Sequence, residues 1–112
     1  MNTSELRELL DGELAGFPER ASGEEGYRFL GRVTRPYVGC AREALVEVLQ
    51  AWVQLRAEPK SMLAVKLAVE FRLGELRNDV EELLNEVREG VAFNPALGSY
   101  YENRLTDALS RI

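Results

Sequence analysis

The hydrophobic residues of this chain recur at helical spacing along most of its length. Apolar positions fall three and four residues apart from Leu6 onward, and this spacing returns after Pro36, Lys60, Asn78 and Ser99. Such spacing places apolar side chains on one face of a helix. No stretch alternates apolar and polar residues over a useful length. The pattern predicts an all-α protein of five to six helices.

The predicted helix over residues 60–73 differs from the others because it is apolar nearly all round. A helix of this kind is usually buried on more than one side. We therefore predict that it is the most buried helix and that it forms an antiparallel hairpin with the helix after it. Its predicted neighbours are helix 36–57 on one side and helices 78–89 and 99–111 on the other.

Capping and helix-breaking residues divide the chain between these helices. Gly74 is predicted to end helix 60–73 in the left-handed conformation, and Gly90 to end helix 78–89. Pro36 fits the first turn of a helix, where its missing N–H is tolerated. Ser, Thr and Asn are preferred N-caps, and Asn94-Pro95 fits a turn or the start of a helix. The predicted N-caps are Thr3 or Ser4, Thr34, Asn78 (with Glu81) and Ser99 (with Glu102).

We expect one domain over residues 1–112, because a chain of this length buries enough surface for its own core. It would consist of an N-terminal helix and loop over residues 1–26 and a stack of helical hairpins over residues 27–112. Three glycines, a proline and four charges favour a loop over residues 16–26. A short helix starting at Ser22 is an alternative for the end of this segment.

The stretch LGELRNDVEELLNEV, from Leu73 to Val87, resembles the turn and second helix of a HEAT-type repeat. The resemblance covers about residues 60–89. Leu30-Gly31 and Leu73-Gly74 lie 43 residues apart, and such repeats have periods of about 40–47 residues. The resemblance implies a HEAT-like or ARM-like stack of antiparallel hairpins. An irregular helical bundle would show the same amphipathic patterns and remains the alternative.

Charge is unevenly distributed along the chain, whose net charge is −5. Residues 1–26, 27–77 and 78–112 carry net charges of −5, +4 and −4. A basic middle between acidic ends favours self-association or an acidic partner, although solvated helix faces explain the same pattern. One cysteine excludes an internal disulfide. The acidic N-terminus and the short apolar runs predict a cytoplasmic protein that does not insert into a membrane.

The residues needed for most catalytic chemistry are missing. The chain has no histidine, which removes the commonest general base and most zinc sites. Cys40 has no partner cysteine and is predicted to be a small buried residue near the start of a helix. No glycine-rich phosphate-binding loop is present. We predict no catalytic, metal-binding or cofactor-binding residues and no cofactor, so the chain is expected not to be an enzyme. Besides the two binding hypotheses given at the end of this section, an enzyme with a carboxylate site is a third hypothesis.

Arginines and aromatic residues concentrate in the segment YRFLGRVTRPY, residues 27–37. This segment suggests an anion-binding or nucleic-acid-binding patch. Its arginines could instead pair with Glu19, Glu24, Glu25 or the acidic C-terminal third, and we favour this second interpretation. A sequence pI near 4.9 speaks against nucleic-acid binding.

Two further aromatic sites complete the candidate surface. Trp52 lies on the broad apolar face of helix 36–57, which a short stack would leave partly uncovered. Tyr100 and Tyr101 are adjacent, so one ring should pack and the other point outward. The candidate interaction surface comprises Tyr27, Arg28, Arg32, Arg35, Tyr37, Trp52 and Tyr100.

The sequence therefore favours a non-catalytic protein–protein interaction or scaffold module. Its partner would be another protein, of unspecified identity, or a second copy in a homodimer. No nucleic-acid or membrane partner is expected. The alternative is a small acidic regulatory or immunity-type protein that masks a basic partner.

Overall fold

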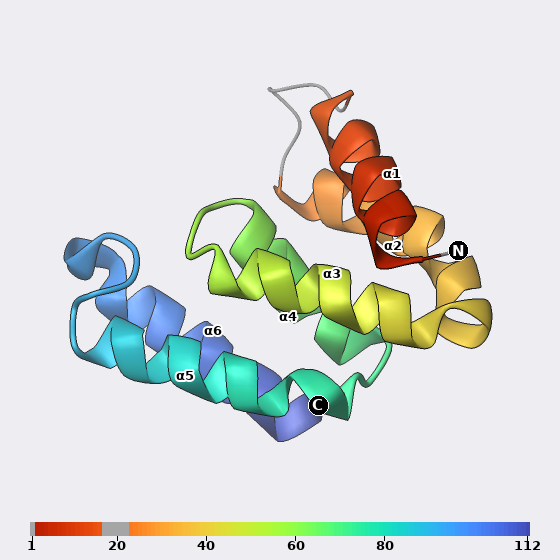
Figure 1. Cartoon of the computed structure of the whole chain (residues 1–112). Coiled ribbons are helices and arrows are strands. Elements are labelled where there is room, and N and C mark those ends of the chain that lie inside the picture. The colour runs from red at the N-terminus through yellow and green to blue at the C-terminus, as the bar shows by residue number, and fades with distance from the viewer. Residues whose placement is uncertain (1, 17–22) are drawn as a thin grey trace.

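The computed structural model describes residues 2–16 and 23–112, and this part of the chain is all-α (Figure 1). It contains six α-helices and two short 3₁₀ helices, η1 and η2. Their bounds are α1 Thr3–Ala15, α2 Gly23–Cys40, α3 Arg42–Gln54, α4 Lys60–Glu70, η1 Gly74–Leu76, α5 Arg77–Arg88, η2 Pro95–Leu97 and α6 Gly98–Arg111. The predicted all-α class is thus confirmed.

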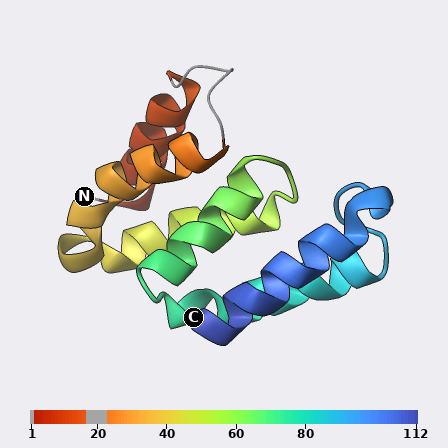
Figure 2. The same cartoon turned by 180° about the vertical axis from the view of Figure 1, so that it is seen from behind.

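The helices form three consecutive antiparallel hairpins, α1–α2, α3–α4 and α5–α6, which stack side by side. Helices α1, α3 and α5 pack in one layer, and α2, α4 and α6 pack in a second layer. Figure 2 shows the second layer nearest the viewer, with α4 between α2 and α6. The molecule measures 37 × 31 × 21 Å. Its thinnest dimension therefore matches two layers of helices, each about 10 Å across.

The first and third hairpins pack on opposite sides of the second. This arrangement is a short stack of hairpins. We call the contact between the first and second hairpins the first seam, and the contact between the second and third hairpins the second seam. The pairing predicted for residues 60–89 is wrong, because α4 forms its hairpin with α3, and α5 forms its hairpin with α6. Helix α5 reaches the second hairpin through α3.

Helix α4 is central and buried, as the sequence predicted. Its buried residues include Met62 through Val65, Leu67 and Ala68. It packs against α3, α2 and α6, which explains why almost no face of it is polar. Two of its three predicted neighbours are correct, and α2 takes the place expected for α5.

The predicted helix 36–57 is wrong at its start. Helix α2 continues through Pro36 to Cys40, and a separate helix α3 begins after Ala41, whose φ and ψ are −146° and 43°. Val33, Tyr37 and Val38 pack on the core across the proline. This packing offsets the cost of about 3 kcal/mol that an interior proline imposes.

Two more sequence expectations fail in the same region. Thr34 is not an N-cap. It is buried inside α2, and its hydroxyl donates to the Leu30 carbonyl at 2.7 Å. Leu30-Gly31 lies inside α2 and does not end a helix, so it cannot be the first copy of a repeated Leu-Gly turn.

The ends of α4 and α5 share one geometry, in which the chain turns through a left-handed residue. Arg72 (φ 51°) follows α4, and Gly90 (φ 75°) follows α5. After α4, the Leu73 N–H bonds to the Ala68 carbonyl at 2.8 Å, which is the Schellman motif. Gly90 was predicted correctly. Gly74 was not, because it starts η1 and the left-handed position falls on Arg72.

The N-caps differ from most of the sequence expectations. Asn2 caps α1 by accepting from the Glu5 N–H at 2.8 Å. Asn94 caps η2 through the Ala96 N–H at 3.1 Å, with Pro95 as the first helical residue. The 3₁₀ turns η1 and η2 lead directly into α5 and α6, so neither helix has a side-chain cap. The caps predicted at Thr3 or Ser4, Asn78 and Ser99 are therefore wrong, and the start predicted at Ser22 lies outside the described residues.

The outer helices of the stack are not left with bare apolar faces. Among the described residues, the large hydrophobic side chains that remain exposed are Leu55, Val91, Leu97 and Tyr100. All lie at or beside the tips of the second and third hairpins. Trp52, expected on the surface, is only 3% exposed. It belongs to the core because the first hairpin covers the face of α3 and α4 on which it lies.

Candidate functional site: a groove across the second layer

A groove runs along α4 between α2 and α6. Its larger hollow is about 230 Å³ and its smaller hollow about 120 Å³. The larger is lined by Glu24, Tyr27, Met62, Val65, Lys66, Val69, Arg104, Asp107, Ala108 and Arg111. The smaller is lined by Glu58, Pro59, Met62, Leu63, Lys66, Tyr100 and Arg104. The hollows share Met62, Lys66 and Arg104 and therefore adjoin.

Helical spacing supplies both the floor and one wall of this groove. Met62, Val65, Lys66 and Val69 come from α4 at i, i+3, i+4 and i+7. The wall formed by α6 repeats this spacing with Arg104, Asp107, Ala108 and Arg111. Residues so spaced lie on one helix face. The groove therefore has an apolar floor and a charged rim, because the second layer sets these two faces side by side.

The two carboxylates of the larger hollow are already paired within the chain. Glu24 lies 3.4 Å from Arg28 and 3.7 Å from Lys66. Asp107 lies 3.2 Å from Arg111. Arg104 is exposed, and within the described part of the chain its guanidinium lies over the Tyr100 ring, with 4.7 Å between the guanidinium carbon and the ring centroid. The groove thus holds one arginine that has no carboxylate partner among these residues.

Tyr27 fixes the wall formed by α2. Its hydroxyl donates to the Glu70 carboxylate at 2.6 Å, and Arg35 reaches the other oxygen of Glu70 at 3.2 Å. Burial, together with the hydrogen bond to Glu70, raises the pKa of Tyr27 to about 12. Tyr27 therefore stays protonated at neutral pH and holds α2 against α4. Lys66 lies over its ring, with the ammonium nitrogen 5.4 Å from the ring centroid.

Two tyrosines shape the end of the groove at the hairpin tips. Tyr101 is 7% exposed, whereas its neighbour Tyr100 is 50% exposed, so one ring packs and the other points outward as predicted. The Tyr101 ring stacks on Phe93, and its hydroxyl donates to Glu58 at 3.1 Å. Burial and the Glu58 carboxylate raise the pKa of Tyr101. Tyr101 thereby joins the tip of the second hairpin to the third.

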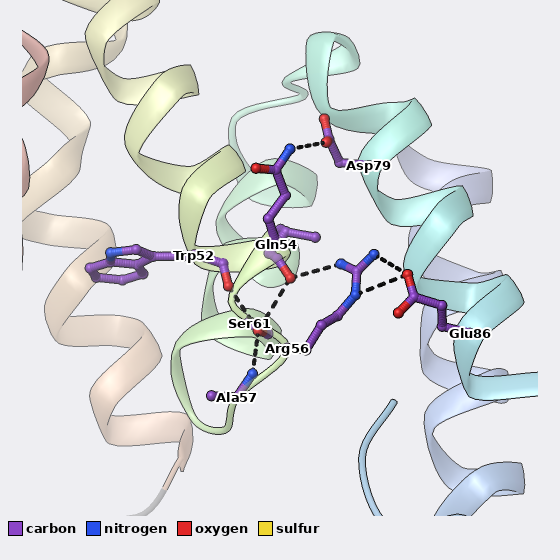
Figure 3. Close-up of polar contacts among 8 residues, drawn as sticks. Trp52, Gln54, Arg56, Ala57, Ser61, Asp79 and Glu86 are labelled. Carbon is purple, nitrogen blue, oxygen red and sulfur yellow. Dashed lines mark hydrogen bonds and ion pairs between the residues drawn. The ribbon is translucent and has the colours of Figure 1, made fainter. Parts of the chain in front are cut away.

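A polar network at the second seam holds the loop after α3 (Figure 3). Ser61 is fully buried, and its hydroxyl donates to the Trp52 carbonyl at 2.8 Å while accepting from the Ala57 N–H at 3.0 Å. The hydroxyl therefore bridges the two backbone groups that would bond directly in a Schellman motif. Arg56 (φ 55°) occupies the left-handed position of this turn.

The same loop is tied to α5 by charged groups. Arg56 donates to the Glu86 carboxylate at 3.2 and 2.5 Å and to the Val53 carbonyl at 2.9 Å. The hydrogen bonds from Arg56 lower the pKa of Glu86. Asp79, 7% exposed, accepts from Gln50 and Gln54 at 3.2 and 3.1 Å. These contacts fix the third hairpin on the second, and so set the distance between α4 and α6 in the groove.

The structure brings together two of the seven residues of the predicted interaction surface. Tyr27 and Tyr100 line the groove from α2 and α6. Arg28 pairs with Glu24, as the favoured interpretation required, whereas Arg35 pairs with Glu70. Glu19 lies outside the described residues. Arg32 is exposed and Tyr37 half-buried, and neither lines the groove. Trp52 is in the core.

Sequence reasoning missed the central groove residues Met62, Lys66 and Arg104. The available signal was the i, i+3, i+4, i+7 spacing on α4 and α6. The sequence indicated only that Met62 is buried and that Lys66 lies on the exposed edge of its helix, because the stacking order that brings the α4 and α6 faces together was not known.

Several other features bear on chemistry. Cys40, predicted to be buried near the start of a helix, is exposed at the end of α2, where its thiol donates to the Pro36 carbonyl at 3.2 Å. Residues 2–16 and 23–112 contain no group of three His, Cys, Asp or Glu side chains that could hold a metal ion. Within these ranges, no helix combines the length and the hydrophobicity needed to cross a bilayer.

No protein-family model matches this chain, and neither a curated protein nor a solved structure is significantly similar to it.

Proposed function

We propose that this protein is a non-catalytic protein-binding module and that the groove along α4 receives a polypeptide segment of its partner. The observation that carries the proposal is the groove itself, with an apolar floor on α4 and charged rims on α2 and α6. Its two adjoining hollows of about 230 and 120 Å³ together reach only the low end of the roughly 300–1,000 Å³ typical of small-molecule pockets. An elongated surface of this kind suits a peptide or an amphipathic helix.

The helical-repeat class fits the same proposal. Three antiparallel hairpins stacked in two layers are the layout of HEAT-like and ARM-like proteins, which bind partners along their stacked surfaces. The Leu73–Gly74 motif lies between two hairpins of this chain and not within one. Support for the repeat class therefore comes from the arrangement of the helices.

A peptide selection with a pair of matched variants tests the proposed function. A phage-displayed library of random peptides of about 12 residues, roughly three helical turns, is selected on the immobilised protein. Val69→Trp fills the groove, whereas Val46→Trp adds the same bulk to a half-buried valine of α3 in the other layer. Far-ultraviolet circular dichroism and thermal unfolding verify that both variants fold.

We expect enriched peptides to bind the parent and Val46→Trp equally, and to bind Val69→Trp at least about tenfold more weakly, a difference of 1.4 kcal/mol. Selection that enriches no peptide, or peptides whose binding is abolished by Val46→Trp and not by Val69→Trp, would refute the proposal.

A further inference from the structure

We infer that Arg104 makes the groove selective for a segment that carries a carboxylate beside aliphatic side chains. This inference rests on the proposed function and specifies the partner's chemistry. Glu24 and Asp107 are engaged by Arg28, Lys66 and Arg111. Arg104, by contrast, contacts the Tyr100 ring, and no carboxylate lies within ion-pair distance of it among the described residues.

The Tyr100 ring holds the Arg104 guanidinium over the groove without neutralising it. A guanidinium stacked on an aromatic face keeps its edge N–H groups available for a carboxylate, which it binds in a bidentate geometry. Because the ring already restricts the side chain, less conformational freedom is lost when a ligand binds. The Arg104 side chain is therefore preorganised to bind an acidic ligand.

The position of Arg104 defines what should flank that carboxylate. Arg104 belongs to both hollows. Pro59, Met62 and Leu63 provide apolar surface on one side of it, and Val65 and Val69 provide apolar surface on the other. A ligand carboxylate at Arg104 thus places neighbouring aliphatic side chains over apolar floor in each hollow.

Charge also favours an acidic peptide over a polyanion. The larger hollow carries three cations, Lys66, Arg104 and Arg111, against the two carboxylates Glu24 and Asp107. With Glu58 of the smaller hollow counted, the groove as a whole carries three cations and three carboxylates, in a chain of net charge −5. A single carboxylate matches the one unpaired arginine. A run of phosphates would meet Glu24, Asp107 and the overall negative charge.

The test compares two short peptides, acetyl-Leu-Glu-Leu-amide and acetyl-Leu-Gln-Leu-amide, titrated into the ¹⁵N-labelled full chain at low ionic strength. Arg104→Gln removes the proposed selector. Arg32→Gln removes an exposed arginine of α2 that does not line the groove. The amide spectrum of each variant shows directly whether it is folded.

We expect the glutamate peptide to bind about fivefold more tightly than the glutamine peptide, the size of one partly exposed ion pair. Arg104→Gln should abolish this preference, whereas Arg32→Gln should retain it. Equal binding of both peptides at the groove amides overturns the inference while leaving the proposed function intact. Failure of both peptides to shift groove amides, in a protein that does bind selected longer peptides, also overturns it. Stronger groove binding by oligothymidylate than by the glutamate peptide would assign the site to phosphate instead.

Discussion

The polar contacts of the first seam lie largely in solvent, whereas those of the second seam are better buried. At the first seam, the Lys60–Asp11 pair is 32% and 40% exposed. At the second, Asp79 is 7% exposed and Arg56 20%. Exposed ion pairs contribute little to stability. A buried carboxylate, by contrast, destabilises the fold unless its hydrogen bonds are made, and those bonds require one fixed geometry. The second seam should therefore be fixed in position more strictly than the first.

This difference bears directly on the groove. The second seam determines how α6 lies against α4, and these two helices supply the floor and the wall on which Arg104 lies. The first seam positions α2, whose contribution to the larger hollow is Glu24 and Tyr27. We infer that the α4–α6 side of the groove is preorganised, and that the α2 side adjusts more easily to a ligand.

The largest expected effects are in the apolar core, where the two outer hairpins should behave alike. Leu10 of α1 and Leu83 of α5 are both fully buried. Leu10→Ala and Leu83→Ala should each lower the free energy of unfolding by about 3 kcal/mol, because each removes methyl groups and leaves a cavity. Urea unfolding measures both. A loss below about 1 kcal/mol in either variant would show that its hairpin is not part of the common core.

The polar contacts should then separate the two seams. Asp79→Ala should lower the free energy of unfolding by about 2 kcal/mol, because it removes a buried carboxylate that two amides and a helix N-terminus stabilise. Asp11→Ala, the matched change at the first seam, should alter it by less than about 0.5 kcal/mol. Urea unfolding of the two variants side by side is the measurement. Equal losses would contradict the proposed difference between the seams.

The smallest expected change in the free energy of unfolding concerns an exposed ion pair at the second seam, Arg42–Glu75. Hydrogen bonds from Arg42, at 2.8 and 2.9 Å, lower the pKa of Glu75 to about 2 from its ordinary 4.5. A carboxylate whose pKa is lowered by folding stabilises the fold above its ordinary pKa. That contribution is lost as the pH falls from about 4.5 toward 2.

Arg42→Met should bring the pKa of Glu75 back toward its ordinary value and remove this part of the acid sensitivity. A ¹³C NMR titration of the Glu75 carboxyl group reports the pKa directly. Because both side chains are more than 40% exposed, the change in unfolding free energy at pH 7 should be smaller than that of Asp79→Ala. An unchanged titration curve would show that the pair does not form in solution.

Sequence patterns predicted the helices better than their order in space. The all-round apolarity of residues 60–73 correctly identified the most buried helix, because that property follows from composition alone. Its hairpin partner was misassigned, since α5 is amphipathic in a way that fits packing against either α4 or α6. The helix start predicted at Pro36 was wrong, because the packing of Val33, Tyr37 and Val38 outweighs the local preference of proline for the first turn.

The candidate site was only partly visible for the same reason. Tyr27 and Tyr100 were singled out as aromatic surface residues, and both line the groove. Helical spacing was the only local signal at Arg104, and it did not identify the residue, because its significance depends on which carboxylates lie nearby after folding. Trp52 was expected on the surface, because the periodicity of α3 does not show that the first hairpin covers this face of the helix.

Mapping a selected peptide by NMR cross-saturation tests the central claim most directly, because it reports which layer of the stack the ligand touches. The peptide is irradiated in complex with the ²H,¹⁵N-labelled protein. The proposed site predicts that the amides that lose intensity cluster on α4 and α6 around Lys66 and Arg104, with a weaker group on α2 around Tyr27. Loss of intensity confined to α1, α3 and α5 would place the binding surface on the opposite layer and contradict the account.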